Sequence, residues 1–233
     1  MRARAQYSLA MTHCARGVRR QYSLGMTHFR EGRTQKAEEC LQRAVTMSSA
    51  RSGPRHPQTL QAAFVLGQLY TGQGNFERAK LLLRAVHEAR KEALGEHHPE
   101  TLTALGALGS VTFYERSLEE ARPLLAATLA GRLATLGGDH PDTLMSMHNL
   151  AVLHMHSGDL LVAQPMLVQA LDKALALGEE SHAASFAASL AKLERLLGES
   201  GPQLISVSGP LDGFILVPGP LGGTLVPVLA VSV

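Results

Sequence analysis

Apolar residues along this chain fall into pairs of stripes with helical spacing. One such pair consists of Leu60, Phe64, Gly67 and Tyr70, followed by Phe76, Ala79, Leu83 and Val86. Residues three and four positions apart lie on one face of an α-helix, so each stripe predicts one amphipathic helix. A Gly-containing break separates the two stripes, and Gly lets the chain leave a helix at little steric cost. Each pair therefore predicts two antiparallel helices.

The same pattern returns with a fixed period. The motif His-Pro-x-Thr-Leu begins at His56, His98 and His140, which lie 42 residues apart, and a degraded copy begins at Ser181. The positions that keep this register are Leu66-Gly67, Leu108-Gly109 and Leu150-Ala151, then Ala79, Ala121 and Ala163, then Leu83, Leu125 and Leu167. A period of this length is typical of a solenoid built from a repeated supersecondary unit. We therefore predict an all-α solenoid of four antiparallel helical hairpins and one closing helix.

This register divides the chain into three parts. Residues 1–16 form an Arg-rich lead, residues 17–198 form the repeat array, and residues 199–233 form an apolar tail rich in Pro and Gly. The expected repeats of the array are 17–56, 57–98, 99–140 and 141–181, followed by a capping helix at 182–198. The capping helix has one apolar and one charged stripe, as the last element of a solenoid must to shield the stack from water.

The His-Pro motif predicts a joint between successive hairpins. Pro suits the first helical turn, where its missing N–H costs nothing, and the acidic residues that follow two of the prolines suit the positive helix end. A Gly three residues before each His is expected to end the preceding helix in a left-handed conformation. We therefore interpret the histidines as residues that cap or pack at the joint. The joint residues are His56, Pro57, His98, Pro99, His140 and Pro141, after Gly53, Gly95 and Gly137.

The break inside each hairpin contains Gly in three of the four repeats. It reads Arg30-Glu31-Gly32-Arg33 in the first, Gly72-Gln73-Gly74-Asn75 in the second and Ser157-Gly158-Asp159 in the fourth. In the third repeat Glu115-Arg116-Ser117 takes this place. Because only Gly enters the left-handed region without steric cost, we expect the third repeat to have the least regular turn.

The motifs together resemble a known family. Leu-Gly-x-x-Tyr at Leu66 to Tyr70, followed by Ala79, Leu83 and Val86, is similar to the tetratricopeptide repeat, whose usual unit is about 34 residues. The longer unit with Gly-x-x-His-Pro-x-Thr-Leu resembles the kinesin light chain and nephrocystin-3 branch of that family. The resemblance covers about residues 17 to 198. It implies a right-handed superhelix whose first helices line a concave groove that holds an extended peptide or a helix.

The resemblance also implies which residues line the groove. The main candidates are Tyr22, Phe29, Phe64, Gln68, Ser110, Phe113, Tyr114, His148, Asn149 and Val152, with Arg19, Met26, Arg30, Gln61, Thr71, Thr103, Met145 and His156 on the same side. Half of the ten Phe and Tyr residues fall on this surface, which suits anchoring an apolar or aromatic side chain of a partner. The alternative is that several of these aromatics pack neighbouring hairpins together.

Two differences from the family's binding residues narrow the range of partners that we expect. Chaperone-binding members hold a C-terminal carboxylate with Lys, Arg and Asn, and such charge-assisted bonds need those cations. This chain has Phe64, Gln68, Ala107, Met145 and Asn149 in their place, which argues against a chaperone carboxylate. Kinesin light chains carry a ladder of Asn residues along the bound peptide, and only Asn149 remains here. The sequence therefore predicts binding to a peptide or helix of another protein and does not identify that protein.

Charge and composition exclude several other classes. The net charge is +2, yet residues 1–30 hold six Arg and no acid, so the remaining residues are net acidic. No general attraction for nucleic acid follows, and the start lacks a nucleic-acid motif. The Arg-rich start leaves organelle import open as an alternative to a cytoplasmic protein, while the near-duplicate octets at Gln6 and Gln21 point to local duplication. Cys14 and Cys40 are too few for a disulfide framework, so a reducing compartment is the default.

Catalysis and metal binding have little support in the pattern. There is no Gly-rich phosphate loop, nucleophile elbow or His-Glu-x-x-His motif, so we expect neither an enzyme nor a cofactor. His148, His154 and His156 share one predicted helix, but their spacings do not place all three on one face, which leaves a His-based metal site as a weak alternative. A sensor or self-association fragment of a larger signalling protein is the other alternative. The favoured hypothesis is a non-catalytic scaffold or adaptor that binds another protein.

The tail differs from the array in composition. Residues 201–233 contain one charged residue, Asp212, and five prolines among Gly and Val-Leu pairs. Prolines at these intervals exclude a membrane-spanning helix and any long strand, so no membrane association is expected. We expect a disordered tail, with a misassigned reading frame or exon as the alternative. A Pro-x-x-Pro motif with basic flanks, which a Pro-rich ligand would need, is missing.

Overall fold

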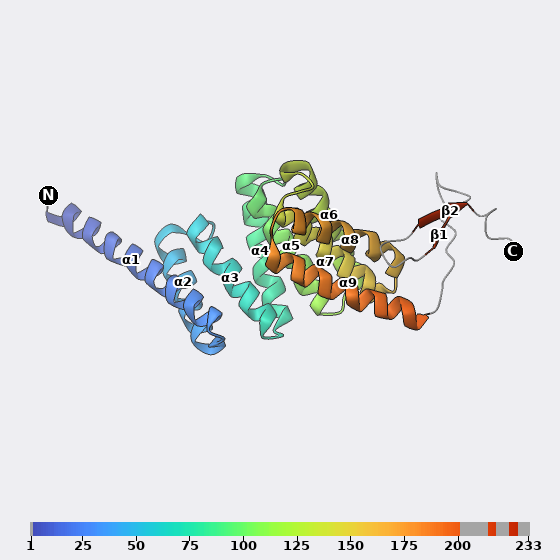
Figure 1. Ribbon diagram of the computed structural model, residues 1–233. Helices are drawn as coiled ribbons and strands as arrows, with labels where there is room; N and C mark the ends of the chain where they lie inside the picture. The colour runs from blue at the N-terminus through green and yellow to red at the C-terminus, as the bar shows by residue number, and fades with distance from the viewer. Residues whose placement is uncertain (1, 201–213, 218–223, 228–233) are drawn as a thin grey trace. The chain divides into compact units, whose positions relative to one another are not determined.

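The computed structural model describes the backbone of residues 2–200, 214–217 and 224–227, and the side chains of residues 16–198 (Figure 1). The helices are α1 (Arg2–Arg30), α2 (Thr34–Ser52), α3 (Pro57–Gly72), α4 (Phe76–Leu94), α5 (Pro99–Tyr114), α6 (Leu118–Leu136), α7 (Pro141–Ser157), α8 (Leu160–Ala176) and α9 (Glu180–Ser200). The chain divides into two compact units, Met1–Gly137 and Gly138–Val233. Unit 1 holds α1 to α6 and unit 2 holds α7 to α9. The predicted helical hairpins and closing helix are confirmed.

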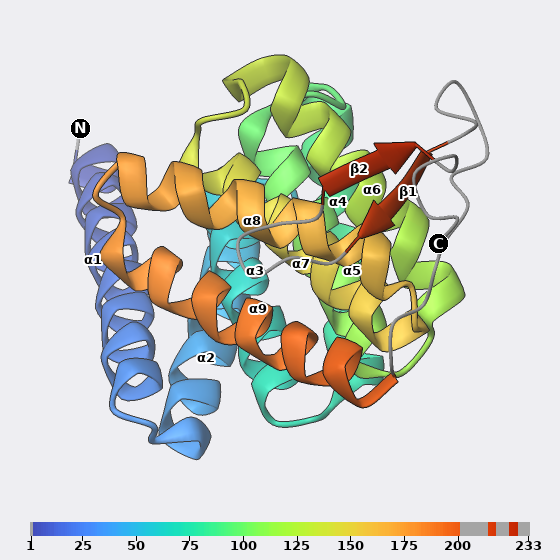
Figure 2. The same ribbon diagram turned by 45° about the vertical axis from the view of Figure 1, so that its right-hand side comes forward.

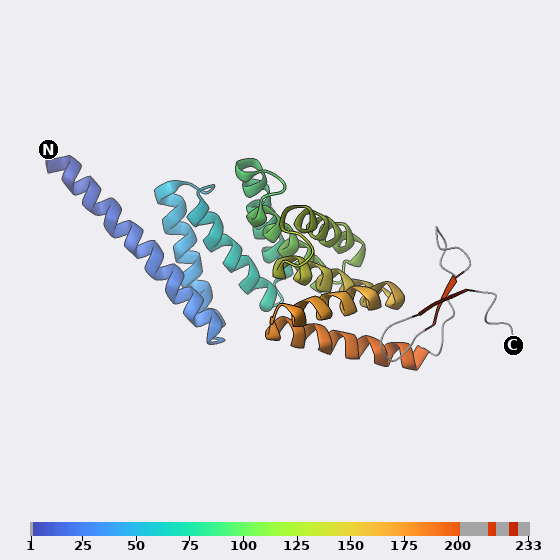
Figure 3. The ribbon, with the colours of Figure 1, turned by 45° about the horizontal axis from the view of Figure 1, so that its top comes forward.

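Unit 1 consists of three hairpins in which each helix packs on the next one in the chain (Figure 3). The core residues repeat with the period seen in the sequence, because Ala79 and Ala121 are fully buried, as is Leu83. A small residue on the first helix lets the second helix approach closely. A Cβ atom added to Gly67 would lie 2.8 Å from Leu83 Cγ, and one added to Gly109 would lie 2.8 Å from a Leu125 methyl carbon. Each hairpin of unit 1 is thus closed by the same Leu-on-Gly contact.

The turn of the third hairpin is as regular as the others, contrary to the expectation from its missing Gly. The amide of Arg116 donates to Phe113 O and that of Ser117 to Thr112 O, just as Gly74 and Asn75 donate in the second hairpin. Arg116 adopts a φ of 72°, close to the 76° of Gly74, so the side chain accepts the left-handed conformation. Arg116 therefore bears the steric cost of the left-handed conformation, and the turn itself is not distorted.

An ion pair ties this turn to the preceding hairpin. Lys80 of α4 donates to Glu115 Oε2 at 2.6 Å. This hydrogen bond raises the pKa of Lys80 and lowers the pKa of Glu115. The corresponding positions of the preceding repeat also interact, because Gln73 donates to Glu38 at 3.1 Å. The second helix of one hairpin therefore holds the turn of the next.

Replacing Arg116 with Gly is expected to stabilise the protein. A non-Gly residue in the left-handed region costs about 1–2 kcal/mol, and part of the gain is offset because Gly is more flexible in the unfolded chain. We expect a net gain of about 0.5–1 kcal/mol, or about 1–4 °C in the unfolding temperature. The reciprocal variant Gly74→Arg should lose a similar amount. Thermal unfolding followed by circular dichroism measures both, and a lower unfolding temperature for Arg116→Gly would contradict the expectation.

The histidines of the His-Pro motif cap the helices that follow them, as predicted. The Nδ1 atoms of His56, His98 and His140 accept the amide hydrogen of the residue two positions later at 3.3, 3.2 and 3.1 Å, with Pro at the first helical position. The glycines before them need a correction. Gly53, Gly95 and Gly137 have positive φ, but their ψ values of 160°, 163° and 170° lie outside the left-handed helical region. That combination is open essentially to Gly alone.

Unit 2 consists of the hairpin of α7 and α8 and the closing helix α9, which runs alongside α8 (Figure 2). Leu167 of α8 and Leu193 of α9 are fully buried with Ala151 and Ala163. Phe186 of α9 is also fully buried. The apolar stripe predicted for the closing helix thus forms the core of this unit.

Two boundaries differ from the expected ones. α1 runs without interruption from Arg2 to Arg30, so the expected border at residue 16 lies inside a helix. α9 begins at Glu180 and ends at Ser200, a little beyond the expected cap. Within the tail the described residues pair as two short antiparallel strands, β1 (Phe214–Val217) and β2 (Thr224–Pro227). The disorder expected for the rest of the tail lies outside the described residues.

Candidate protein-binding surface

In unit 1 the helices α3 and α5 are more deeply packed than α1 and present one narrow stripe each. α3 is largely buried between residues 59 and 70, where only Gln61 and Gln68 are exposed. On α5 the corresponding stripe contains Ser110 and Phe113, both half-buried, and Tyr114, which is 56% exposed. We call these residues the first-helix stripe of unit 1. They coincide with sequence candidates, and the side chains are uncharged.

A hydrogen-bond network holds this stripe in place. Gln61 of α3 donates to the hydroxyl of Tyr22 on α1 at 3.4 Å, and Arg90 of α4 donates to Gln61 Oε1 at 3.0 Å. Arg90 is 3% exposed and also donates to the carbonyl oxygen of Glu100 at 3.1 Å. Burial lowers the pKa of Arg90, and the Glu100 carboxylate opposes this shift. The network links three hairpins through one buried cation.

The arginine of this network escaped the sequence analysis although it keeps the repeat register. Arg132 lies one period after Arg90 and is also buried. It donates to the hydroxyl of Thr103 at 3.1 Å, and Thr103 lies one period after Gln61. The sequence therefore contains a signal for this network, which is a basic residue that recurs after one repeat period on an otherwise apolar helix face. On α4 and on α6, a buried Arg therefore supports a polar residue on the first helix of the same hairpin.

Not every aromatic candidate is available to a partner. Phe64 is 7% exposed and lies under the guanidinium of Arg90, whose Cζ atom is 5.1 Å from the ring centroid. It therefore belongs to the core, as the alternative reading proposed. Tyr22 and Phe29 of α1 are half-buried against this core. Tyr114 packs edge-on against Phe113 with ring centroids 5.5 Å apart, so its ring is held while one side stays exposed.

In unit 2 the candidates Asn149 and Val152 of α7 are half-buried, whereas His148 is 9% exposed. The Nε2 atom of His148 lies 2.8 Å from Ser189 Oγ, and its ring stacks on Phe186 with centroids 4.8 Å apart. His148 therefore holds α9 against α7. Of the ten main candidates, His148 and Phe64 lie in the packed interior, and the other eight are half-buried or exposed.

Acidification should destabilise unit 2 through His148. Burial lowers the pKa of His148 below its ordinary value of 6.5, and a smaller contribution from Asn149 opposes this shift. The unfolded chain then binds this proton at a higher pH than the folded one, so stability falls as the pH decreases through about 6.5. In His148→Gln, which keeps a hydrogen-bonding group for Ser189, the unfolding temperature should fall less between pH 7.5 and 5.5. Equal slopes for both proteins would contradict the expectation.

The remaining histidines of α7 do not converge. The Nδ1 atom of His154 lies 3.1 Å from Asp159 Oδ2, and His156 is exposed. In the described part of the chain, no group of three or more His, Cys, Asp or Glu residues is arranged to hold a metal ion. Among the described helices, none is long and apolar enough to cross a membrane.

The sequence pattern of the tetratricopeptide repeat matches residues 21–92 and 110–176, more than half of the chain. The chain belongs to the tetratricopeptide repeat family. Solenoids of this family are typically non-catalytic, and the resemblance to kinesin light chain repeats stated from the sequence is confirmed. No curated protein matches the sequence.

Several solved structures share the fold of this tetratricopeptide repeat protein. A variant of a kinesin light chain-like protein of Podosopora anserina, built from nearly identical repeats, has a TM-score of 0.61 and 22% identity and covers 81% of this chain and 99% of its own. BtubC from P. vanneervenii has a TM-score of 0.57 and 16% identity, and the match covers 85% of this chain and 95% of BtubC. A Rap protein complexed with Competence and Sporulation Factor has a TM-score of 0.54 and 11% identity and covers 81% and 66%. At these identities the likeness concerns the fold alone.

Proposed function

We propose that this protein is a non-catalytic scaffold or adaptor that binds a peptide or helix of another protein through the faces of its first helices. The observation that carries the proposal is the uncharged, partly exposed stripe of unit 1, where Gln61, Gln68 and Tyr114 remain accessible on otherwise buried helices. Accessible amides suit hydrogen bonds to a peptide backbone, and a held aromatic ring suits an apolar anchor. The expected site of action is the cytoplasm.

The charges of α3, α5 and α7, the first helices of the second, third and fourth hairpins, support a partner segment with little charge of its own. α1 differs from them, because it contains six Arg. α3 contains no Asp, Glu, Lys or Arg, α5 contains only Glu100 and α7 only Asp142. Both acids lie in the first turn of their helix, away from the stripes. Because a charged partner group would lose its hydration here without gaining an ion pair, apolar and uncharged polar segments are favoured. The Rap protein complexed with Competence and Sporulation Factor shows the same fold in a complex and supports this class of function.

Affinity capture with matched variants tests the proposal. Tyr114→Ala removes an exposed anchor from unit 1, Asn149→Ala removes the half-buried amide from unit 2, and Leu81→Ala changes a side chain that is 77% exposed on α4. The first two should each reduce recovery of a specific partner about tenfold, since anchor residues contribute on the order of 1–2 kcal/mol. Leu81→Ala should recover it normally. Equal recovery by all three variants, with folding intact by circular dichroism, would count against the stripes.

A further inference from the structure

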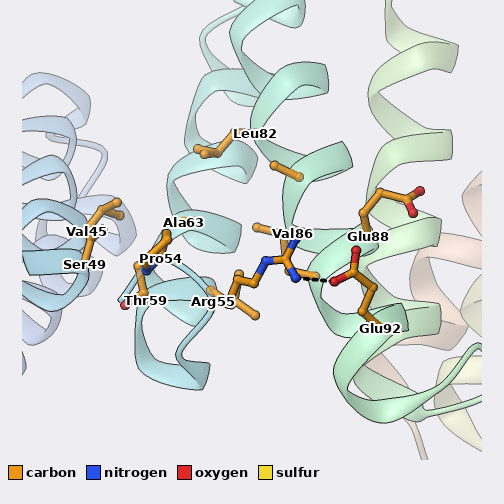
Figure 4. Close-up of a pocket in the computed structure, with 13 residues that line it drawn as sticks. Val45, Ser49, Pro54, Arg55, Thr59, Ala63, Leu82, Val86, Glu88 and Glu92 are labelled. Carbon is orange, nitrogen blue, oxygen red and sulfur yellow. Dashed lines mark hydrogen bonds and ion pairs between the residues drawn. The ribbon is translucent and has the colours of Figure 1, made fainter. Parts of the chain in front are cut away.

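A cavity of about 420 Å³ opens between α2 and α4 of unit 1, with α3 as its floor (Figure 4). Its walls come from Val45 on α2, Leu60 and Ala63 on α3, and Leu82 and Val86 on α4. The cavity shares no residue with the first-helix stripe, so it is a separate feature of the surface. Its volume falls within the range of about 300–1,000 Å³ that is usual for ligand pockets.

The walls offer a ligand little hydrogen bonding. Thr59 lies in the lining, but its hydroxyl is engaged by Gly53 O at 2.9 Å and by Ser48 Oγ at 2.8 Å. The other named wall residues are aliphatic, and Leu60, Ala63 and Val86 are buried. Ser49 of α2 also lies in the lining and carries a second hydroxyl. Because the rest of the interior wall is aliphatic and rewards burial of hydrocarbon, the interior selects an aliphatic or aromatic group.

The repeat register explains why the cavity forms at this junction. One period later, the positions of Val45 and Ala63 hold His87 and Leu105, which are larger. His87 is buried, and its Nδ1 atom lies 3.4 Å from Thr101 O. The space between the first and second hairpins therefore results from small side chains at positions that are filled in the following repeat.

The rim of the cavity is charged. Arg55, Glu88 and Glu92 stand at the opening, and Arg55 is paired with Glu92 (Figure 4). The side chain of Glu88 is 61% exposed, and its Oε1 atom lies 4.0 Å from His87 Nε2. The three rim residues thus carry a net charge of about −1, with an exposed carboxylate beside an apolar interior. An apolar pocket surrounded by a polar rim is the arrangement found at anchor positions of protein interfaces.

We propose that this cavity is a second docking pocket, which takes an apolar side chain of a partner protein whose neighbouring residue is Lys or Arg. The apolar side chain enters between Val45 and Leu82, and the neighbouring cation pairs with Glu88. Rim pairs of this kind add little affinity but select the sign of the partner's charge. The pocket acts independently of the first-helix stripe.

Methyl NMR with three capped tetrapeptides tests this proposal on the full chain. The probes are acetylated and amidated Gly-Leu-Lys-Gly, Gly-Leu-Glu-Gly and Gly-Ser-Lys-Gly. The Leu-Lys peptide should shift the methyl signals of Val45 and Ala63. These shifts should reach a plateau as the peptide concentration rises. The Ser-Lys peptide should bind about tenfold more weakly because the apolar burial is lost. The Leu-Glu peptide should bind about threefold more weakly, and Glu88→Gln should remove this charge preference.

Filling the cavity provides the matched variants. Ala63→Leu introduces the residue that the next repeat carries at this position, and Ser49→Leu fills the cavity from α2 should the first variant disturb folding. Ala126→Leu adds the same atoms at an exposed position of α6. The filled variants should lose peptide binding and the Ala126→Leu protein should keep it. The proposal is overturned by unshifted Val45 and Ala63 signals, by binding that survives filling, or by binding of 1-hexanol with no charge preference among the peptides. Shifts on concentration of the protein alone would assign the pocket to a second copy and overturn it as well.

Discussion

Replacing Leu83 with Ala is expected to lower the stability of unit 1 by about 3–4 kcal/mol. Leu83 is fully buried, and large-to-small changes at such positions lose both the transfer free energy and the packing around the resulting cavity. Its side chain lies directly over Gly67, at the crossing of α3 and α4. Urea unfolding followed by circular dichroism measures the loss. A change below about 1 kcal/mol would show that the contact does not hold the hairpin together.

A double-mutant cycle makes this expectation more specific. Gly67→Ala should destabilise the wild-type protein, because the three heavy atoms nearest to the added Cβ atom all belong to Leu83, which must move. In the Leu83→Ala protein the obstacle is gone, and Ala favours the helix by about 1 kcal/mol over Gly, so the same change should become stabilising. Gly72→Ala is the control, because a Cβ atom there meets nothing within 4 Å. Additive effects in the cycle would contradict the close crossing.

Replacing Arg90 with Met is expected to lower the stability of unit 1 by about 2–4 kcal/mol and to weaken partner binding as well. The buried guanidinium donates to Gln61 Oε1 and to Glu100 O, and hydrogen bonds from charged groups contribute about 1.5–3 kcal/mol. Without it, Gln61 loses the contact that positions its amide on the first-helix stripe. Urea unfolding and quantitative partner capture measure the two effects.

The exposed Arg84 of the same helix provides the control for this change. Arg84→Met removes the same charge from α4 but no buried hydrogen bond, so stability should change by less than about 0.5 kcal/mol. Equal effects of the two substitutions would show that Arg90 acts through the net charge of the helix. If the Arg90→Met protein is stable and captures the partner normally, the Arg90 network is needed neither for stability nor for binding.

The repeat register accounts for how much of the fold could be predicted. Because equivalent positions of successive hairpins meet equivalent neighbours, Ala79 and Leu83 could be placed in the core from the spacing alone. The histidine caps followed from the chemistry of the His-Pro joint. The conformation of Gly95 did not, because a positive φ is compatible with more than one ψ value. Arg116 shows that a turn pattern can tolerate a strained residue when the rest of the hydrogen bonding is intact.

The candidate surface was predictable only in part. The register placed Gln68 and Tyr114 on the accessible stripe, yet it gave no reason to separate them from Phe64, whose burial depends on Arg90 from another helix. The burial of His148 depends on α9, where the repeat motif is degraded. The cavity between α2 and α4 depends on differences in side-chain volume between repeats. The burial of Phe64 and His148 and the cavity arise where side chains differ from one repeat to the next. The repeat period alone therefore does not reveal them.

Hydrogen exchange of the full chain with and without a captured partner shows which helices the partner covers. If the partner binds the faces of the first helices, amide protection should increase in α3 and α5, and in α7 where unit 2 takes part. The Tyr114→Ala protein should show a smaller increase at the same partner concentration. Protection confined to α2, α4, α6 and α8, with none in the first helices, would contradict the proposed binding surface.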